Sequence, residues 1–392
     1  MERWKGGQAM AHIVVAGAGY AGMLAALRLR KTRAHQVTLV SASPNFVERI
    51  RLHQTAADGT RVESPLTRLI AGAPIGLVLG RIAELQPARR EILLADGTAL
   101  TYDRLIYALG SQTGTSAVPG VSAYAHRLNN PDSAARLYAA LLERHAGRLL
   151  VVGGGLTGIE AAAEIAKRHA EWQVTLLSAG TLGADLSPRG QDYLRAALRR
   201  KGVSVIENQR AARLEADRAY CAGGAVESFD MCLWAGSFEV SKLAAQSGFA
   251  VDAAGRILVD AALRSISHPE VYVVGDAAAS GLRMGCATAL PMGAHAADSI
   301  LADLDDEPVQ PHRFGYTVRC ISLGRDDGLI QLVDPLDQPR DRIITGRPGA
   351  VVKELVCQGT WYSLEIERRL PGAFTWNRAE VPSSLRPLPS LA

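Results

Sequence analysis

Two stretches of the chain combine an apolar run with three glycines in a spacing that suits phosphate binding. They are IVVAGAGYAG at residues 13–22 and LLVVGGGLTGIE at residues 149–160. In a G-x-G-x-x-G turn the first glycine allows a tight bend, the second lets a pyrophosphate approach the backbone, and the third lets the helix pack against the strand. Each stretch therefore predicts a strand, a turn and a helix whose N-terminus faces phosphates. The glycines are Gly17, Gly19 and Gly22 in the first stretch and Gly153, Gly155 and Gly158 in the second.

A third motif, VYVVGD, places Gly275 and Asp276 directly after another apolar run. Two dinucleotide turns followed by a late Gly-Asp pair predict a flavoprotein that takes electrons from a nicotinamide nucleotide. No metal ion is needed for that chemistry, and none is predicted.

Serines stand where acids usually bind the ribose of each dinucleotide. The acid is expected at the end of the second strand, about twenty residues after the last glycine. Ser41 and Ser178 occupy these places. A serine can hydrogen-bond a ribose hydroxyl but loses the charge-assisted bond, so the contact is weaker. The choice between NADH and NADPH therefore stays open.

Residues 46–59, FVERIRLHQTAADG, bring basic side chains together after the second strand. In such a domain this loop folds back over the cofactor, so Arg51, His53 or Gln54 are predicted to lie along the flavin. The alternative is a solvated loop followed by the start of a helix.

Composition narrows the class of protein. The chain has 392 residues, 48% of them hydrophobic, a net charge of +4 and no run of like charges, which gives no indication of nucleic-acid binding. The N-terminus has no apolar core of the length found in signal peptides, and no later apolar stretch is long enough for a membrane span. The cysteines are scattered, number five and form no CxxC pair, which favours a reducing compartment. A cytoplasmic protein is expected.

Five motifs in this order resemble the two-dinucleotide-domain flavoprotein reductases of the pyridine nucleotide-disulfide oxidoreductase superfamily, without a redox disulfide. Besides the glycine turns, they are YDRLIYALGS at residues 102–111, CLWAGS at 232–237 and the stretch 255–276. Within this superfamily, the chain is most similar to the branch of type II NADH dehydrogenases and apoptosis-inducing-factor-like proteins. The resemblance implies FAD at the first turn and NAD(P)H at the second.

The resemblance also implies roles for individual residues. Asp276 would hydrogen-bond the ribityl chain or its phosphate end, and Glu160 would lie near the nicotinamide. The residues expected to bind the cofactors are Gly17, Gly19, Gly22, Ser41, Arg51, Gly110, Gly275, Asp276, Leu290, Pro291, Gly153, Gly155, Gly158 and Ser178. Those expected to act in catalysis are Cys286, His53 and Glu160.

The stretch after the Gly-Asp pair departs from type II NADH dehydrogenases. It reads MGCATALPMGAHAADSI, residues 284–300, without the glutamine of that family. Backbone N–H groups near Leu290 to Gly293 are expected to face the flavin from a helix N-terminus. Cys286, if it lies there, is expected to have a lowered thiol pKa and to act as a nucleophile or as a charge-transfer donor to the flavin. The alternative is a small buried core residue.

Together these patterns predict an α/β fold with two Rossmann-like domains, the second inserted in the first, and a smaller α+β C-terminal domain. The expected limits are 10–115 with 244–305 for FAD, 116–243 for NAD(P)H and 306–392 for the third. Within the first domain, residues 92–100 are expected to form a hairpin that turns at Asp96 and Gly97. In the third, residues 316–323 and 329–333 are expected to form strands, and 349–369 a helix interrupted at Gly359.

The predicted activity is hydride transfer from NAD(P)H to FAD and on to a small-molecule acceptor, a quinone or another aromatic compound. A flavin oxidase or monooxygenase, and a non-enzymatic redox sensor, are the alternatives. A homodimer through the third domain is expected, and integral membrane association is not.

Overall fold

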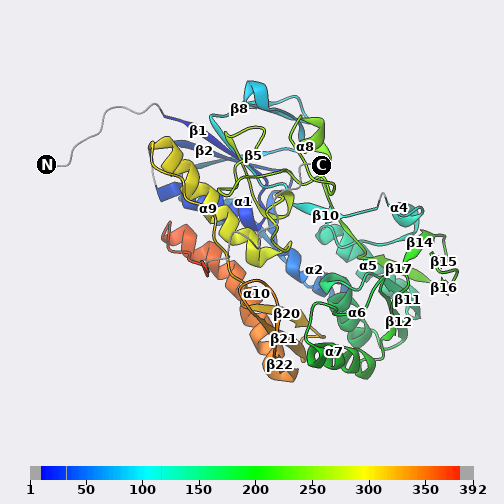
Figure 1. Ribbon diagram of the computed structural model, residues 1–392. Helices are drawn as coiled ribbons and strands as arrows, with labels where there is room; N and C mark the ends of the chain where they lie inside the picture. Colours follow the sequence, from blue (N-terminus) through cyan, green and yellow to red (C-terminus); the bar gives the residue numbers. More distant parts are fainter. Residues whose placement is uncertain (1–9, 32, 116, 380–392) are drawn as a thin grey trace.

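The structure is a computed structural model that describes residues 10–31, 33–115 and 117–379. Residues 380–392, the end of the predicted third domain, lie outside the described part. Three units are visible (Figure 1), and the second, in green, lies beside the first. The predicted α/β class with a smaller α+β unit is confirmed, because the first two units each have a parallel sheet and the third has an antiparallel sheet.

The first unit is built on a five-stranded parallel sheet in the order β19-β9-β1-β2-β5. Its strands are rich in Val, Ile and Leu, and β1, β2, β9 and β19 are largely buried, as is typical of a parallel sheet covered on both faces. The strands are β1 (His12–Ala16), β2 (Gln36–Ser41), β5 (Ile75–Leu79), β9 (Arg104–Tyr107) and β19 (Val271–Val273). The helices of this unit are α1 (Tyr20–Arg28), α2 (Leu52–Asp58), α3 (Leu66–Leu69) and α9 (Cys286–Leu304), with 3-10 turns η1 (Leu29–Lys31), η2 (Arg49–Arg51), η3 (Pro87–Arg89) and η4 (Gly275–Ala277).

Smaller antiparallel pieces surround this sheet. A predicted hairpin that turns at Asp96 and Gly97 is confirmed, and a third strand extends it. The pieces are β3 (Asn45–Val47) with β4 (Glu63–Pro65), and β6 (Ile82–Gln86) with β7 (Glu91–Leu94) and β8 (Ala99–Thr101).

The second unit repeats the plan with a four-stranded parallel sheet in the order β13-β12-β11-β17. Its strands are β11 (Gly147–Val152), β12 (Trp172–Leu177), β13 (Ser204–Ile206) and β17 (Met231–Trp234). Its helices are α4 (Val121–Tyr124), α5 (Pro131–Arg144), α6 (Leu156–Arg168) and α7 (Pro188–Arg200), and an antiparallel sheet of β14 (Ala211–Leu214), β15 (Arg218–Cys221) and β16 (Val226–Ser228) completes it.

Two connectors join the first unit to the second. β10 (Ser111–Thr113) leaves the first unit, and β18 (Phe238–Val240) returns antiparallel beside it, followed by α8 (Leu243–Gln246). The second unit is thus inserted in the first, as the sequence predicts. The predicted limits at 115/116 and 243/244 lie close to the pair, and we keep them as a proposal.

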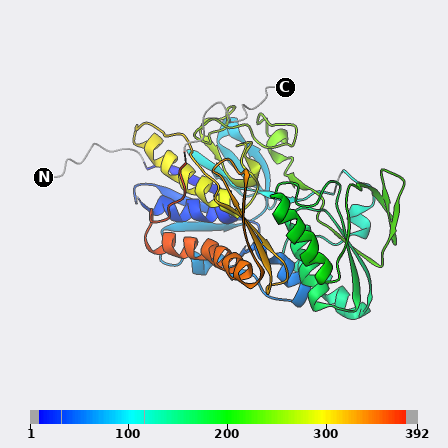
Figure 2. The same ribbon diagram turned by 60° about the horizontal axis from the view of Figure 1, so that its bottom comes forward.

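The third unit is a three-stranded antiparallel sheet with one long helix. The strands are β20 (Val318–Ser322), β21 (Gly328–Val333) and β22 (Pro339–Thr345), and the helix is α10 (Gly346–Arg369). The predicted interruption at Gly359 is wrong, because α10 runs through it. A glycine inside a helix is less favourable than an alanine by about 1 kcal/mol. The packing of α10 on β21 and on α1 offsets this cost. Figure 2 shows α10, in orange to red, running alongside α1 and α9.

Within the described residues, none of the helices combines the length and the apolar character that crossing a bilayer requires. The same residues hold no group of three or more His, Cys, Asp or Glu side chains arranged for a metal ion.

Gly293 and Gly359 form a matched pair of helix glycines. A Cβ added at Gly293 in α9 would overlap the carbonyl oxygen of Ala21 in α1, whereas nothing lies within 4 Å of a Cβ at Gly359. We expect Gly293→Ala to lower the free energy of unfolding by about 1–3 kcal/mol, because the helices must separate. Gly359→Ala should raise it by about 0.5–1 kcal/mol. Thermal unfolding of both variants measures this, and equal shifts would contradict the close α1–α9 contact.

Candidate functional site

The first glycine turn follows β1 and has the geometry that its spacing predicts. Gly17 has φ +110°, and a Cβ there would overlap the carbonyl oxygen of Ala108. A Cβ at Gly22 would overlap the carbonyl oxygen of Gly17. At Gly19, the residue before α1, an added Cβ would meet nothing within 4 Å. The turn therefore leaves open space in front of the α1 N-terminus, as a pyrophosphate needs.

The second turn repeats this arrangement between β11 and α6. Gly153 has φ +127°, and a Cβ there would overlap the carbonyl oxygen of Ala235. A Cβ at Gly158 would overlap the carbonyl oxygen of Gly153, whereas nothing lies within 4 Å of one at Gly155. The second turn thus fits a second dinucleotide in the same way.

Both serines expected at the riboses use their hydroxyl protons locally. Ser41 Oγ donates to the carbonyl of Ser43 at 2.7 Å, and Ser178 Oγ donates to the carbonyl of Gly180 at 2.8 Å. Because its proton is already used, each serine hydroxyl could only accept a hydrogen bond from a ribose hydroxyl. Their roles at the riboses stay predictions.

Asp276 lies in η4, where polar groups from three segments meet. Ser111 Oγ donates to Asp276 Oδ2 at 2.7 Å, and Arg49 Nη1 donates to the carbonyl of Ser111 at 2.6 Å. Gly110 and Gly275 flank these residues with φ of +63° and +69°, conformations that favour glycine. A small pocket runs from Gly275 and Asp276 to the start of α9. The structure thus brings Gly110, Gly275 and Asp276 together, and their contact with the cofactor stays a prediction.

Arg51 pairs with the third unit, and its contact with the flavin stays a prediction. Its guanidinium turns to α10, where Nη1 and Nη2 donate to the two carboxylate oxygens of Glu354 at 2.9 and 2.7 Å, and it also contacts Glu48. A bidentate pair of this kind holds the guanidinium on α10. Arg49, two residues earlier, takes the place near Asp276.

The predicted helix N-terminus near Leu290 is four residues too late. α9 begins at Cys286, and the Ala289 N–H already donates to the Gly285 carbonyl at 3.0 Å. Helix geometry leaves free N–H groups only in the first turn, before Ala289. Pro291 is typical of a first turn, but here it lies inside the helix. Leu290 and Pro291 are buried, and their contact with the cofactor stays a prediction.

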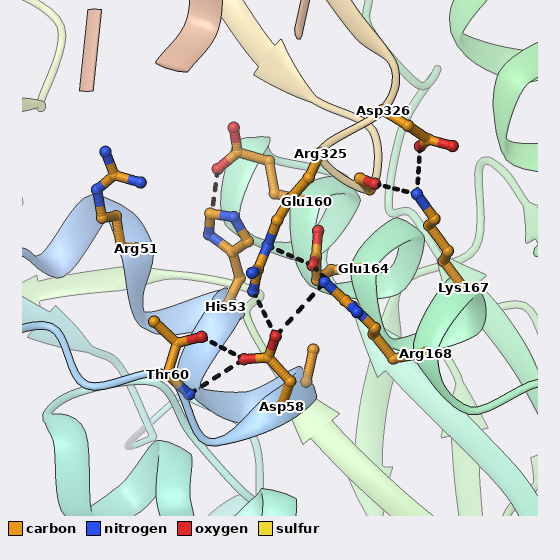
Figure 3. A network of polar contacts seen from close by, with 12 residues as sticks. Arg51, His53, Asp58, Thr60, Glu160, Glu164, Lys167, Arg168, Arg325 and Asp326 are labelled. Carbon is orange, nitrogen blue, oxygen red and sulfur yellow. Dashed lines mark hydrogen bonds and ion pairs between the residues drawn. The ribbon is translucent and has the colours of Figure 1, made fainter. Parts of the chain in front are cut away.

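Glu160 lies where the three units meet, and it is 6% exposed. Its Oε1 accepts from the Ser322 N–H of β20 and from the Lys353 ammonium of α10, each at 2.9 Å. Its Oε2 is 3.7 Å from His53 Nδ1 of α2 (Figure 3). One carboxylate therefore links the second unit to the other two.

Burial and pairing set the charge of this group. Burial alone would raise the pKa of Glu160, but the Lys353 charge, His53 and the Ser322 bond outweigh it and lower the pKa. Burial likewise opposes the charge of Lys353, yet Glu160 raises the pKa of that ammonium. Burial lowers the pKa of His53 to about 4, although Glu160 acts against it. Near neutral pH the group is an ion pair beside a neutral imidazole.

Cys286 does not have the lowered thiol pKa that was expected. It is the first residue of α9 and half-buried against the core of the first unit. Burial raises its pKa to about 11, and the Lys353 charge offsets this only in part. The thiol is therefore protonated near neutral pH, which weakens a role as nucleophile. All five cysteines are free thiols.

Two residues of this site were missed in the sequence, Arg49 and Lys353. The sequence does not distinguish Arg49 from Arg51, because both are arginines of the same basic stretch after β3. Lys353 has no sequence signal, because a lysine on a helix is normally solvated. Its burial follows from α10 packing across β20 and β21.

The low pKa of His53 should make the free energy of unfolding depend on pH. The unfolded state takes up a proton near the ordinary pKa of 6.5, whereas folded His53 takes it up only near 4. Stability is therefore lost as the pH falls from 6.5 toward 4, by about 2 kcal/mol at pH 5. His53→Gln should reduce the loss between pH 7.5 and 5 by about that amount.

Denaturant unfolding at the two pH values measures this loss. The matched control is His145→Gln, at an exposed position, which should keep the wild-type loss. An unchanged loss in His53→Gln would show that His53 is not held neutral by burial.

Known proteins give an independent comparison. The model of the pyridine nucleotide-disulphide oxidoreductase family matches residues 11–299. An NADH dehydrogenase-like protein of Mycobacterium tuberculosis is 28% identical over 344 residues, which are 80% of this chain and 86% of that protein. The ferredoxin–NAD(+) reductase component of a biphenyl dioxygenase system from Paraburkholderia xenovorans is 35% identical over 70% of this chain and 69% of that protein.

Solved structures have the same fold. The sulfide:quinone oxidoreductase of Aquifex aeolicus aligns over 92% of both chains with a TM-score of 0.80 and 18% identity. NDH2 of Plasmodium falciparum, solved with NADH, aligns over 94% of this chain and 100% of that chain with a TM-score of 0.76 and 14% identity. The chain therefore belongs to the pyridine nucleotide-disulphide oxidoreductase family, and it is an FAD-dependent oxidoreductase that uses NAD(P)H.

Proposed function

We propose that the enzyme passes the electrons of NAD(P)H through FAD to a small-molecule acceptor, a quinone or another aromatic compound. FAD and NAD(P)H supply the hydride chemistry when bound, and the protein supplies position and electrostatics. The observation that carries this proposal is the pair of glycine turns. Each leaves open space at the middle glycine, in front of its own helix N-terminus.

The first site is assigned to FAD. The free N–H groups and dipole of α1 would hold the pyrophosphate at Gly19. Asp276, oriented by the Ser111 hydroxyl, would accept from a hydroxyl of the ribityl chain. Arg49 fixes the Ser111 backbone and so sets the position of that hydroxyl.

The second site is assigned to the nicotinamide nucleotide. The N-terminus of α6 would hold its pyrophosphate at Gly155. The same helix carries Glu160 toward the first and third units. The nicotinamide end is therefore expected on the side where the three units meet.

Lys353 supports an acceptor that gains negative charge during reduction. Its ammonium is held by Glu160 at 2.9 Å and stays charged near neutral pH. Glu160 balances this charge, but the N–H groups of the ammonium that do not face Glu160 would hydrogen-bond a developing oxyanion such as that of a quinone. His53 Nε2 has no hydrogen-bond partner among the described residues and is available to the same acceptor.

A protein acceptor is the second candidate. The relative with 35% identity is a ferredoxin reductase component by name. A net charge of +4 suits the docking of an acidic iron–sulfur protein.

Cellular location and oligomeric state are proposals too. Five free thiols fit the cytoplasm. A homodimer would bury the large apolar side chains that α10 exposes, which are Val351, Leu355, Val356, Tyr362 and Ile366.

The acceptor assignment can be tested by double-mixing stopped flow without oxygen. The enzyme is first reduced with one equivalent of NAD(P)H and then mixed with a short-chain quinone. Lys353→Met should slow flavin reoxidation by quinone about 100-fold and change flavin reduction much less, because the lost charge acts on the acceptor. The control Lys242→Met, at an exposed position, should match the wild type.

Because Lys353→Met leaves Glu160 unpaired, the double variant Lys353→Met with Glu160→Gln is measured beside it. Equal reoxidation by quinone in the wild type and in both variants would contradict the role of Lys353. Faster reoxidation by a ferredoxin than by quinone would favour the protein acceptor, and faster reoxidation by oxygen would favour an oxidase.

A further inference from the structure

An ion cluster joins the three units a few residues from Glu160 (Figure 3). Asp58 ends α2 in the first unit, Glu164 and Arg168 lie on α6 in the second, and Arg325 lies in the β20–β21 turn of the third. Arg325 Nε is 2.7 Å from Glu164 Oε1, and its Nη2 is 2.9 Å from Asp58 Oδ2. A single guanidinium therefore pairs with carboxylates of two other units.

The Glu164 carboxylate depends on this contact. Its side chain is fully buried, and the second cation near it, Arg168, is 3.6 Å away. Burial raises the pKa of Glu164, and Arg325 is the first group that opposes the rise. A buried carboxylate that loses its cation is strongly disfavoured, so the contact with Arg325 stabilises Glu164 in this position.

Asp58 holds the same guanidinium from the other side. Its Oδ1 accepts from the Thr60 N–H at 3.0 Å, and Arg168 is 3.5 Å from its Oδ2. The carboxylate is thus oriented before Arg325 binds it. The planar fork of an arginine can pair with two carboxylates in this way, which a lysine ammonium cannot reproduce.

The turn that carries Arg325 is fixed on α6 at further points. Lys167 Nζ donates to the Gly324 carbonyl at 2.9 Å and pairs with Asp326 at 2.7 Å. Arg325 itself has φ +61°, a conformation that costs energy in a residue with a Cβ. The contacts of the cluster are what stabilise this backbone.

The cluster lies on the two helices that carry the site. Glu164 is one helical turn after Glu160 on α6, and the same helix begins at the second glycine turn. Asp58 ends α2, the helix of His53. Fixing α6 against α2 therefore fixes the second dinucleotide turn relative to the first unit.

We infer that Arg325 is a positioning residue, which sets the approach of the nicotinamide site to the flavin site by holding Glu164 of α6 and Asp58 of α2 together. It touches neither dinucleotide turn and acts through the two helices. The inference rests on the proposed hydride transfer between the two sites.

The test compares Arg325→Gln and Arg325→Lys with Arg347→Gln, a control at an exposed position of the same unit. Flavin reduction is followed by stopped flow without oxygen over a range of NAD(P)H concentrations. Both Arg325 variants should reduce their flavin about 10- to 100-fold more slowly at saturation, because a small misplacement of donor and acceptor is costly. FAD content and the dissociation constant for NAD(P)⁺, measured by calorimetry, should stay within about threefold.

A second readout does not depend on activity. Small-angle scattering of the FAD-loaded protein should show a larger radius of gyration in both Arg325 variants than in the wild type and the control. Because removal of Arg325 alone leaves Glu164 unpaired, Arg325→Gln with Glu164→Gln is measured as well, and it should show the same slow reduction in a folded protein.

A flavin-reduction rate within about twofold of the wild type in any folded Arg325 variant, with only a lower melting temperature, would overturn the inference and leave Arg325 a structural residue. If neither NADH nor NADPH reduces the wild-type flavin, the proposed function fails. In that case the scattering decides, and an unchanged radius of gyration would overturn the role of Arg325.

Discussion

The N–H groups that begin α1 and α6 need partners that helix geometry cannot provide. The first intrahelical bonds run from Met23 to Gly19 and from Ile159 to Gly155, so the N–H groups before them face the open space of each turn. An anion there gains the hydrogen bonds and the dipole together. Gly17 and Gly153 can adopt the bend only because they lack a Cβ, and Gly22 and Gly158 let the helix lie directly on the turn. The two parallel sheets exist, in functional terms, to present these two helix ends.

Burial of charge is the second constraint, and it joins the units to one another. Glu160 and Glu164 lie on the buried face of α6, and neither could remain there without a cation. The cations come from the third unit, as Lys353 and Arg325. The C-terminal unit therefore completes the interface between the dinucleotide domains, and we propose that it takes part in setting the reaction geometry.

The parts that the sequence predicts correctly are those whose cause is local. Each glycine turn depends on a few neighbouring residues, and so does the hairpin at Asp96 and Gly97. Arg49 and Arg51 cannot be told apart locally, because their difference lies in Glu354, about 300 positions away. Lys353 and Arg325 could not be predicted for the same reason, since their partners are on α2 and α6. The helix N-terminus expected near Leu290 from the resemblance is wrong, because α9 begins at Cys286 and Pro291 lies inside it.

If the two glycine turns hold a donor and an acceptor of hydride, a nicotinamide nucleotide must reduce the bound flavin. The most direct measurement is the visible spectrum of the FAD-loaded protein without oxygen, titrated with NADH and then NADPH, beside Gly155→Val. We expect the flavin bands of the wild type to bleach with at least one nucleotide, whereas the variant keeps its FAD and stays yellow. A wild type that stays yellow with both nucleotides, or a variant that bleaches equally fast, would contradict it.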